Sequence, residues 1–345
     1  MGVQITDLLV REEIPLDSLK HKVIAVDSSL FLYQFLTSIR SHDGSLLTDS
    51  HGNVTSHLVG LFSRTTRLMQ QNLKLVYVFD GKPPILKQKE RDKRREQKII
   101  AENKYKEAAK KEDYAEMKKY AARTTRLTSE MVEEAKKLIE ALGLPMVEGP
   151  SEGEAQAAHL VKQGDAYGVA SQDADCLLFG SPVLIRNLSL AGKRKINQKL
   201  SFEVVKPEKI DLHKTLASLG ISHKQLIALG MLVGTDFNPC GIKGIGPKNA
   251  LKLVRKYPLD YEALFNEVGW HKYFDYSWKE VYDIISNMPI TDSYSLSWNP
   301  IDEEKIKKLL VDMHDFAEER VMQSIGSLKE TRDKLSQKGL TDFFK

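Results

Sequence analysis

Short apolar runs along the chain have the pattern of buried strands in a parallel sheet. They are Val23–Val26, Leu75–Phe79, Leu144–Val147 and Ala166–Ala170. The intervals between them contain stretches with apolar residues at helical spacing, of which Thr55–Gln71 and Ser129–Leu142 are the clearest. Strands that alternate with helices predict an α/β protein, in which helices flank a mostly parallel central sheet.

One long charged segment, Lys82–Arg126, interrupts this alternation. It is rich in helix-forming residues and poor in large apolar ones, so it is predicted to form helix without a wide buried face. Between Lys82 and Lys111 it contains 12 Lys or Arg residues and 5 Asp or Glu residues. A solvated charged helix explains this composition, whereas a helical arch over the edge of the sheet would place the charge against a polyanion.

The part of the chain after residue 180 has a different pattern. Ser181–Val205 contains hairpin material, Asp211–Tyr257 is predicted to be helical around a glycine-rich turn, and Ile301–Gly326 has further helix. The predicted regions are 1–98 and 129–260 for the core, 99–128 for the arch continuing from about residue 82, 261–326 for a helical part of the same core, and 327–345 for a flexible tail.

Composition adds limits on the class of protein. Apolar residues make up 41% of the chain, charged residues 28%, and the formal net charge is +4, as in ordinary globular proteins. No apolar run approaches the ~18–20 residues of a membrane span, and the N-terminus is too polar for a secretory signal. With only two cysteines, we expect an intracellular protein.

The strand-like runs end on acidic residues. Asp27 ends the first run, Asp80 ends the second, and Asp173 and Asp175 follow the last. Because ligands of α/β sheets bind outside the carboxyl ends of the strands, these acids are expected to converge. A single acid at a strand end is explained by capping of the next helix, but three such ends are not.

Three further acids belong to the same hypothesis. Glu152 and Glu154 precede an apolar helical run, and Asp236 lies before a glycine-rich turn. Ser151 with Glu154 also matches a capping box, which explains Glu154 but not Glu152. The alternative to a metal-binding role for Asp236 is that of a turn or cap residue.

Seven carboxylates in one place would repel one another strongly unless a cation compensates them. Hard divalent ions such as Mg²⁺ or Mn²⁺ prefer oxygen ligands, and the sequence has no His or Cys cluster with zinc spacing. An all-carboxylate site favours two-metal phosphodiester hydrolysis. A phosphatase with an aspartate nucleophile is disfavoured, because Ser28 and Ser29 follow Asp27 where many such enzymes have D-x-D.

At these acids the sequence resembles the flap endonuclease family in its archaeal and eukaryotic form. The matching motifs, in family order, are VDSSLFLYQFL (Val26–Leu36), VFDGKPPILK (Val78–Lys87), EGPSEGEAQAA (Glu148–Ala158), ASQDADCLLFG (Ala170–Gly180) and GTDFNPCGIKGIGPKNAL (Gly234–Leu251). The resemblance implies a PIN-like fold and an Mg²⁺-dependent nuclease that cuts 5′ flaps and acts as a 5′–3′ exonuclease in replication and base excision repair. It also implies a location in the cytoplasm or nucleoid of an archaeon or in the nucleus of a eukaryote.

The resemblance also implies roles for single residues. Asp27, Asp80, Glu152 and Glu154 would hold one ion, and Asp173, Asp175 and Asp236 mainly the other. Lys87 and Arg94 would reach the scissile phosphate, which agrees with their spacing of two turns on one helical face, ~10.5 Å. Tyr33 would stack on a base, with packing inside the protein as the alternative. Gly2 would have its amine near the active site if Met1 is removed.

The run Gly241–Leu253 has the form of a helix-hairpin-helix motif. Backbone N–H groups at such a turn can hold a phosphate, and a plain connection between helices is the alternative. The predicted DNA contacts are Gly241, Lys243, Gly244, Gly246 and Lys248. The resemblance adds a K⁺ ion that bridges this turn to the duplex.

The end of the chain contains Q-x-x-L-x-x-F-F, formed by Gln337, Leu340, Phe343 and Phe344. These residues make one face of a helical turn, which resembles a motif that binds the sliding clamp PCNA. A tail folded back onto its own domain is the alternative.

We expect a monomer apart from the clamp. A non-catalytic, clamp-tethered DNA-junction binder remains the alternative function, although it would not need seven acids.

Overall fold

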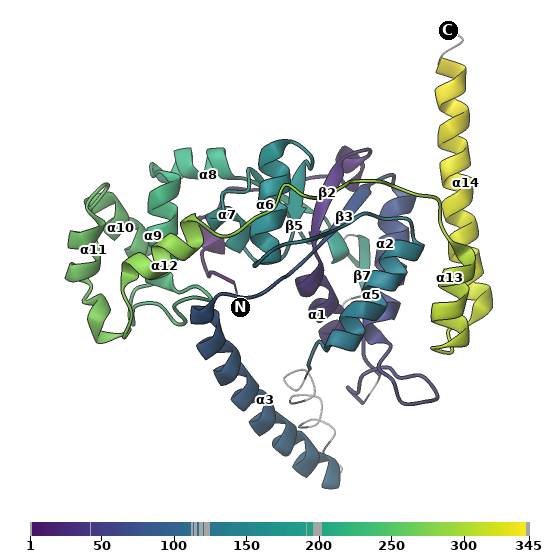
Figure 1. Cartoon of the computed structure of the whole chain (residues 1–345), viewed down its shortest axis with the longest axis horizontal. Coiled ribbons are helices and arrows are strands. Elements are labelled where there is room, and N and C mark those ends of the chain that lie inside the picture. Colours follow the sequence, from purple (N-terminus) through teal and green to yellow (C-terminus); the bar gives the residue numbers. More distant parts are fainter. Residues whose placement is uncertain are drawn as a thin grey trace.

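The computed structural model describes residues 2–41, 43–111, 113, 116, 120, 125–190, 192–195 and 202–342. Of residues 89–95, 97, 106, 109, 192–195, 202–204 and 332–342 it describes the backbone. Figure 1 shows a central sheet with helices on both faces and two long helices, α3 and α14, that extend away from this body. The helical α/β fold predicted from the sequence is confirmed.

Within the described residues, the main sheet has seven strands in the order β1-β9-β6-β5-β2-β3-β4. They are β1 (Arg11–Glu13), β2 (Val23–Asp27), β3 (Lys74–Phe79), β4 (Met146–Glu148), β5 (Gly168–Ala170), β6 (Val183–Arg186) and β9 (Glu208–Asp211). The pairs from β4 through β6 are parallel, and β9 pairs antiparallel with β6 and β1. All four predicted strands are present, although β5 starts two residues later than its apolar run.

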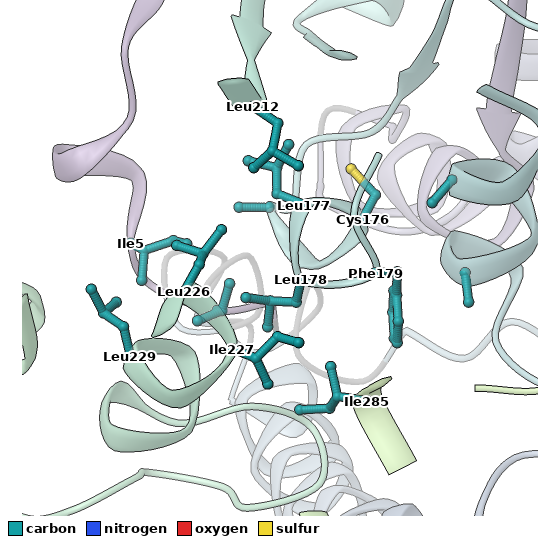
Figure 2. Close-up of a cluster of buried hydrophobic side chains, with 14 of the residues drawn as sticks. Ile5, Cys176, Leu177, Leu178, Phe179, Leu212, Leu226, Ile227, Leu229 and Ile285 are labelled. Atoms are coloured by element: carbon teal, nitrogen blue, oxygen red, sulfur yellow. The ribbon is translucent and has the colours of Figure 1, made fainter. Parts of the chain in front are cut away.

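Alternating residues of the strands pack into two separate cores. Ala25 and Val76 point into the α6-side cluster, which also contains Leu160, Leu229 and Phe265. Figure 2 shows part of this cluster, in which the side chains of Leu177, Leu178, Leu226 and Ile227 approach one another. Ile24, Val26, Phe31, Leu61 and Leu75 belong to the α1-side cluster on the opposite face. This alternation is the period of two expected of a buried strand.

Helices cover both faces of the sheet. The α1-side cluster is built with α1 (Ser28–Ser38), α2 (Ser56–Gln70), α5 (Ser129–Ala141) and α13 (Glu303–Lys307). The α6-side cluster is built with α6 (Gly153–Gln163), α7 (Asp175–Leu178), α8 (Leu212–Leu219), α9 (His223–Val233), α10 (Pro247–Lys256), α11 (Tyr261–Glu267) and α12 (Trp278–Ser286). In the described part of the chain, no single helix is long and apolar enough to cross a membrane. Helices α8 and α9, which are bent by 80° relative to each other, have that length and composition only when taken together.

The predicted arch begins as α3 (Ile85–Lys110), and Figure 1 shows it leaving the body near the N-terminus. This confirms the helix expected over the first part of the charged segment. The predicted hairpin is also present, because β7 (Gly192–Lys195) pairs antiparallel with β8 (Phe202–Val205).

The end of the chain differs from the prediction. A flexible tail was expected from residue 327, but α14 (Glu318–Asp342) continues as helix through most of it. Val321, Ile325 and Leu328 are buried at helical spacing and anchor the first turns. The residues that follow lack proline and are mostly good helix formers, so helix propagates from this anchored start.

A largely buried network of two histidines and two acids joins four segments. Asp49 accepts backbone N–H bonds from His51 and Asn53 at 3.0 and 2.8 Å, and lies 2.9 Å from Nδ1 of His314. The carboxylate of Glu134 on α5 lies 3.1 Å from Nε2 of His57 and 3.3 Å from Nε2 of His314. The network therefore connects the loop before α2, helix α2 itself, helix α5 and the segment before α14.

This network makes stability depend on pH. Burial, followed by the charge of His314, lowers the pKa of His57 from 6.5 to about 4. The folded state therefore favours neutral His57, and this contribution is complete above pH 6.5 and is lost as the pH falls toward 4. We expect the free energy of unfolding to fall by about 3 kcal/mol from this group over that interval. A His57→Gln variant should lose that part of the pH dependence in urea unfolding, whereas His51→Gln, at an exposed position, should keep it.

Candidate active site

The seven predicted acids line one cavity of about 1100 Å³ at the carboxyl ends of the central strands. They are Asp27, Asp80, Glu152, Glu154, Asp173, Asp175 and Asp236. Tyr33 and Lys87 line the same cavity, together with Lys98 and Lys104 of α3. The predicted convergence of the acids is therefore present.

Asp27 is the last residue of β2 and the N-cap of α1. Its carboxylate accepts the backbone N–H of Leu30 at 3.1 Å and the hydroxyl of Ser171 at 3.2 Å. The capping role considered for this acid is thus correct, and it coexists with a place in the cavity. Since the cap fixes one oxygen, the strand-to-helix turn orients the carboxylate.

Asp80 follows β3 and is held by two neighbouring segments. The hydroxyl of Ser29 donates to Oδ2 at 2.6 Å, and the backbone N–H of Gly153 donates to Oδ1 at 2.6 Å. A side chain at Gly153 would put its Cβ 2.9 Å from Oδ1, so glycine permits this approach. The start of α6 therefore positions Asp80 as well as Glu154.

Asp173 and Asp175 are held by the N-terminal segment. The backbone nitrogens of Gly2 and Val3 lie 3.0 Å from Asp173 Oδ2 and 2.5 Å from Asp175 Oδ1. The expected location of Gly2 beside the acids is therefore present, while Met1 lies outside the described residues. The two backbone donors stabilise carboxylates that lie among other acids of the cavity.

The capping-box interpretation of Glu154 is wrong. Glu152 occupies the N-cap position of α6, so Ser151 and Glu154 do not stand in the two capping-box positions. Glu154 lies in the first turn, where the positive end of the helix dipole favours a carboxylate. Both glutamates are thereby directed to the cavity.

The buried acids repel one another. Burial, then the charge of Asp80, raises the pKa of Asp27 to about 7, and burial with Asp236 and Asp173 raises that of Asp175 to about 7. Burial and the charges of Asp175, Asp27 and Asp173 raise the pKa of Glu154 well above its usual range. An all-oxygen donor set under this repulsion fits hard divalent cations.

Lys87 lies between two of these acids. Its ammonium group pairs with Oε2 of Glu152 and lies 3.2 Å from Oδ2 of Asp236. Although burial opposes the charge, Glu152 and Asp236 raise the pKa of Lys87 above its usual range. Within the described residues, no three His, Cys, Asp or Glu side chains already have the geometry of one ion's ligands.

The other predicted contacts on α3 and α1 are only partly described. Arg94 lies on α3, and its side chain is outside the described part. Tyr33 lines the cavity, and the ammonium group of Lys98 lies 5.4 Å from the centre of its ring. Tyr33 is therefore available at the cavity wall, as stacking on a base requires.

The glycine-rich turn has the predicted form between α9 and α10. Pro247 occupies the first turn of α10, and the turn residues Lys243, Gly244, Gly246 and Lys248 are exposed. Gly241 differs from this group because it is buried, and a Cβ there would lie 2.4 Å from the carbonyl oxygen of Leu232. Gly241 therefore packs the turn against α9, and of the five predicted DNA contacts only the other four are exposed.

Sequence reasoning missed several residues that shape the cavity. Ser29 and Ser171 hold catalytic-site carboxylates, and their position directly beside or near Asp27 and Asp173 in the motifs was an available signal. In the tail, Gln337 and Leu340 lie on α14 with side chains outside the described part, and Phe343 and Phe344 are outside it entirely.

A parallel sheet with carboxylates at its strand ends, beneath a basic helix, defines the class of metal-dependent nucleases with a PIN-like fold. Family models for the XPG N-terminal domain and the XPG I-region match residues 1–101 and 143–236. The chain is 49% identical to "Flap endonuclease 1" of Hyperthermus butylicus over 96% of this chain and 95% of that protein. It is also 49% identical to "Flap endonuclease 1" of Pyrococcus abyssi, over 100% of this chain and 98% of that protein. The chain belongs to the flap endonuclease family.

Solved structures agree with this assignment. The structure of flap endonuclease-1 from Methanococcus jannaschii matches with a TM-score of 0.75 and 42% identity, over 96% of this chain and 98% of that chain. The catalytic core of Rad2 in complex with a DNA substrate matches with a TM-score of 0.66 over 95% and 100%. At 23% identity the second match shows the shared fold alone.

Proposed function

We propose that this protein is an Mg²⁺-dependent nuclease that removes 5′ flaps from DNA and also acts as a 5′–3′ exonuclease, in replication and repair. The observation that carries the proposal is the convergence of seven carboxylates with Lys87 in one cavity. Carboxylates repel the negatively charged phosphates of DNA. DNA phosphate can therefore enter the cavity only if cations compensate the charge of the carboxylates.

The proposal divides the seven acids of the cavity into two groups of ligands. In the proposal, Asp27, Asp80, Glu152 and Glu154 hold one Mg²⁺ and Asp173, Asp175 and Asp236 mainly hold the other, with Mn²⁺ able to substitute. Such a pair supplies an activated water and a stabilised leaving oxygen for phosphodiester hydrolysis. Ser29, Gly153 and the backbone of Gly2 and Val3 orient the carboxylates, which keeps the ligand positions fixed before DNA arrives.

Cationic and aromatic residues of the chain position the DNA. Lys87 and Arg94 neutralise charge that develops on the scissile phosphate, and Tyr33 stacks on a nearby base. The turn with Lys243, Gly244, Gly246 and Lys248 holds duplex phosphate, with K⁺ as its bridging ion. These contacts select DNA by shape and not by base sequence.

The partner and location follow from the tail and the substrate. We propose that Gln337, Leu340, Phe343 and Phe344 bind the sliding clamp PCNA, which raises the local concentration of the enzyme at replication sites. The protein would act as a monomer apart from the clamp, inside the cell where DNA is replicated.

The proposal is tested with a 5′-labelled double-flap DNA. The wild-type protein is expected to release the flap near the junction in Mg²⁺ and not in EDTA. An Asp173→Ala variant is expected to bind the DNA and cleave it at least ~10²-fold more slowly, because it loses an inner ligand. A blunt duplex labelled at its 5′ end measures the exonuclease activity in parallel.

Binding without cleavage by the wild-type protein in either Mg²⁺ or Mn²⁺ would contradict the proposed activity. That result would favour the non-catalytic junction binder. Cleavage in EDTA would instead contradict the metal dependence.

A further inference from the structure

The position of Lys87 has a consequence for metal binding. Its side chain is 19% exposed and contacts Glu152, which comes from the start of α6, and Asp236, which comes from the loop after α9. The proposed function assigns these two acids to different ions. One ammonium group therefore contacts two carboxylates, each of which is expected to bind a different divalent cation.

We propose that Lys87 is a resident counter-cation, which a divalent ion must displace from Glu152 and Asp236 in order to bind. This inference rests on the proposed metal site. The same displacement frees the ammonium group at the base of α3, where it can turn to a phosphate that enters the cavity. Lys87 would thus serve the acids before metal binding and the DNA after it.

The electrostatics of the pair support competition. Glu152 is 5% exposed, and its carboxylate pairs with the ammonium group of Lys87, whose side chain is 19% exposed. An ammonium group held between two carboxylates stays charged, so it occupies the position as a cation. A ligand that must first displace another has its apparent affinity reduced by the fraction of sites still free.

The base of α3 is held independently of the Lys87 side chain. Lys87 stands in the first turn of α3, and the preceding segment is held by backbone bonds from Gly81 to Ser151 and from Lys82 to Pro150. Removing the ammonium group therefore changes the charge of the cavity while these backbone bonds keep the segment in place. Lys82, which is exposed and lies outside the cavity lining, gives a matched control.

The test measures Mn²⁺ binding to the whole protein without DNA, by the loss of the free-ion signal in electron paramagnetic resonance. Lys87→Met keeps most of the side-chain length and removes the charge, so it is expected to bind Mn²⁺ at least tenfold more tightly than wild type. Lys82→Met is expected to stay within twofold of wild type, and Lys87→Arg to remain close to it because the competing charge is kept.

Equal or weaker Mn²⁺ binding by Lys87→Met, compared with Lys82→Met, would overturn the inference. Circular dichroism establishes folding of each variant, and Lys87→Gln replaces Lys87→Met if the latter is unfolded. Absence of Mn²⁺ binding in every variant would overturn the proposed metal site itself. If wild type binds Mn²⁺ and Lys87→Met binds it with the same affinity, the proposed metal site is supported and only the proposed role of Lys87 is contradicted.

Discussion

Replacing Glu154 with glutamine is expected to lower the rate of 5′-flap cleavage by about 10³-fold, while stabilising the metal-free protein. Glutamine keeps the size of the side chain and removes a negative ligand from the cavity, so cation binding and charge stabilisation in the transition state are lost together. Single-turnover cleavage of a flap substrate in Mg²⁺ measures the first effect. Glu133→Gln, at an exposed position on α5, is the matched control and should cleave at the wild-type rate.

The stabilising effect follows from the raised pKa of Glu154. Burial and the charges of Asp175, Asp27 and Asp173 raise the pKa of Glu154 in the folded state, so its negative charge costs stability once the unfolded chain has ionised. Removing the charge should raise the free energy of unfolding by about 1–2 kcal/mol in urea with EDTA at pH 8. The difference should shrink as the pH falls toward 4.5, the ordinary pKa of a glutamate, because the unfolded wild-type chain then carries the same proton as the folded one. A destabilised variant, or one that cleaves normally, would contradict this account of the cavity.

Replacing Phe265 with alanine is expected to cost about 3–5 kcal/mol in the free energy of unfolding. Phe265 is 1% exposed, stacks on Trp278 with ring centres 4.8 Å apart, and meets the edge of Trp270 at 5.2 Å. The variant loses these contacts and leaves a cavity that rigid aromatic neighbours cannot fill. Urea unfolding followed by circular dichroism measures the change.

The control for Phe265→Ala is Leu259→Ala on the same part of the chain. Leu259 is 90% exposed, so its removal takes little apolar surface out of a buried environment and should change stability by less than about 0.5 kcal/mol. A similar loss in both variants would mean that the aromatic cluster does not carry the stability of α11 and α12.

The sheet and the acid positions could be predicted from the sequence because they depend on local, repeating patterns. Buried parallel strands are short apolar runs. Asp27 and Asp80 come at the ends of such runs, and Asp173 and Asp175 follow within five residues of the end of β5. The order of the strands was not predictable in this way, because nothing local in β2 indicates that its neighbours are β3 and β5. The antiparallel pairing of β1 and β9 at one edge has the same cause.

The site was predicted less fully than the fold. The pairing of Lys87 with Glu152 and Asp236 depends on how α3 crosses the cavity, which only the three-dimensional arrangement gives. Glu154 matched a capping box by spacing alone, yet the helix starts one residue later than the motif requires. The tail was read as irregular because its apolar pattern stops, although helix propagates from the buried turn at Val321 and Ile325.

The strand order also determines when the protein becomes able to act during its synthesis. Ile24 of β2 pairs with Gly168 of β5, so the acids of these strands meet only after a long stretch of chain has been made. Asp236 is added later still, from the loop after α9. Pairing between such distant residues is slow compared with local helix formation. A chain still emerging from the ribosome therefore carries Asp27 and Asp80 without their partners, and cannot damage DNA before its fold is nearly complete.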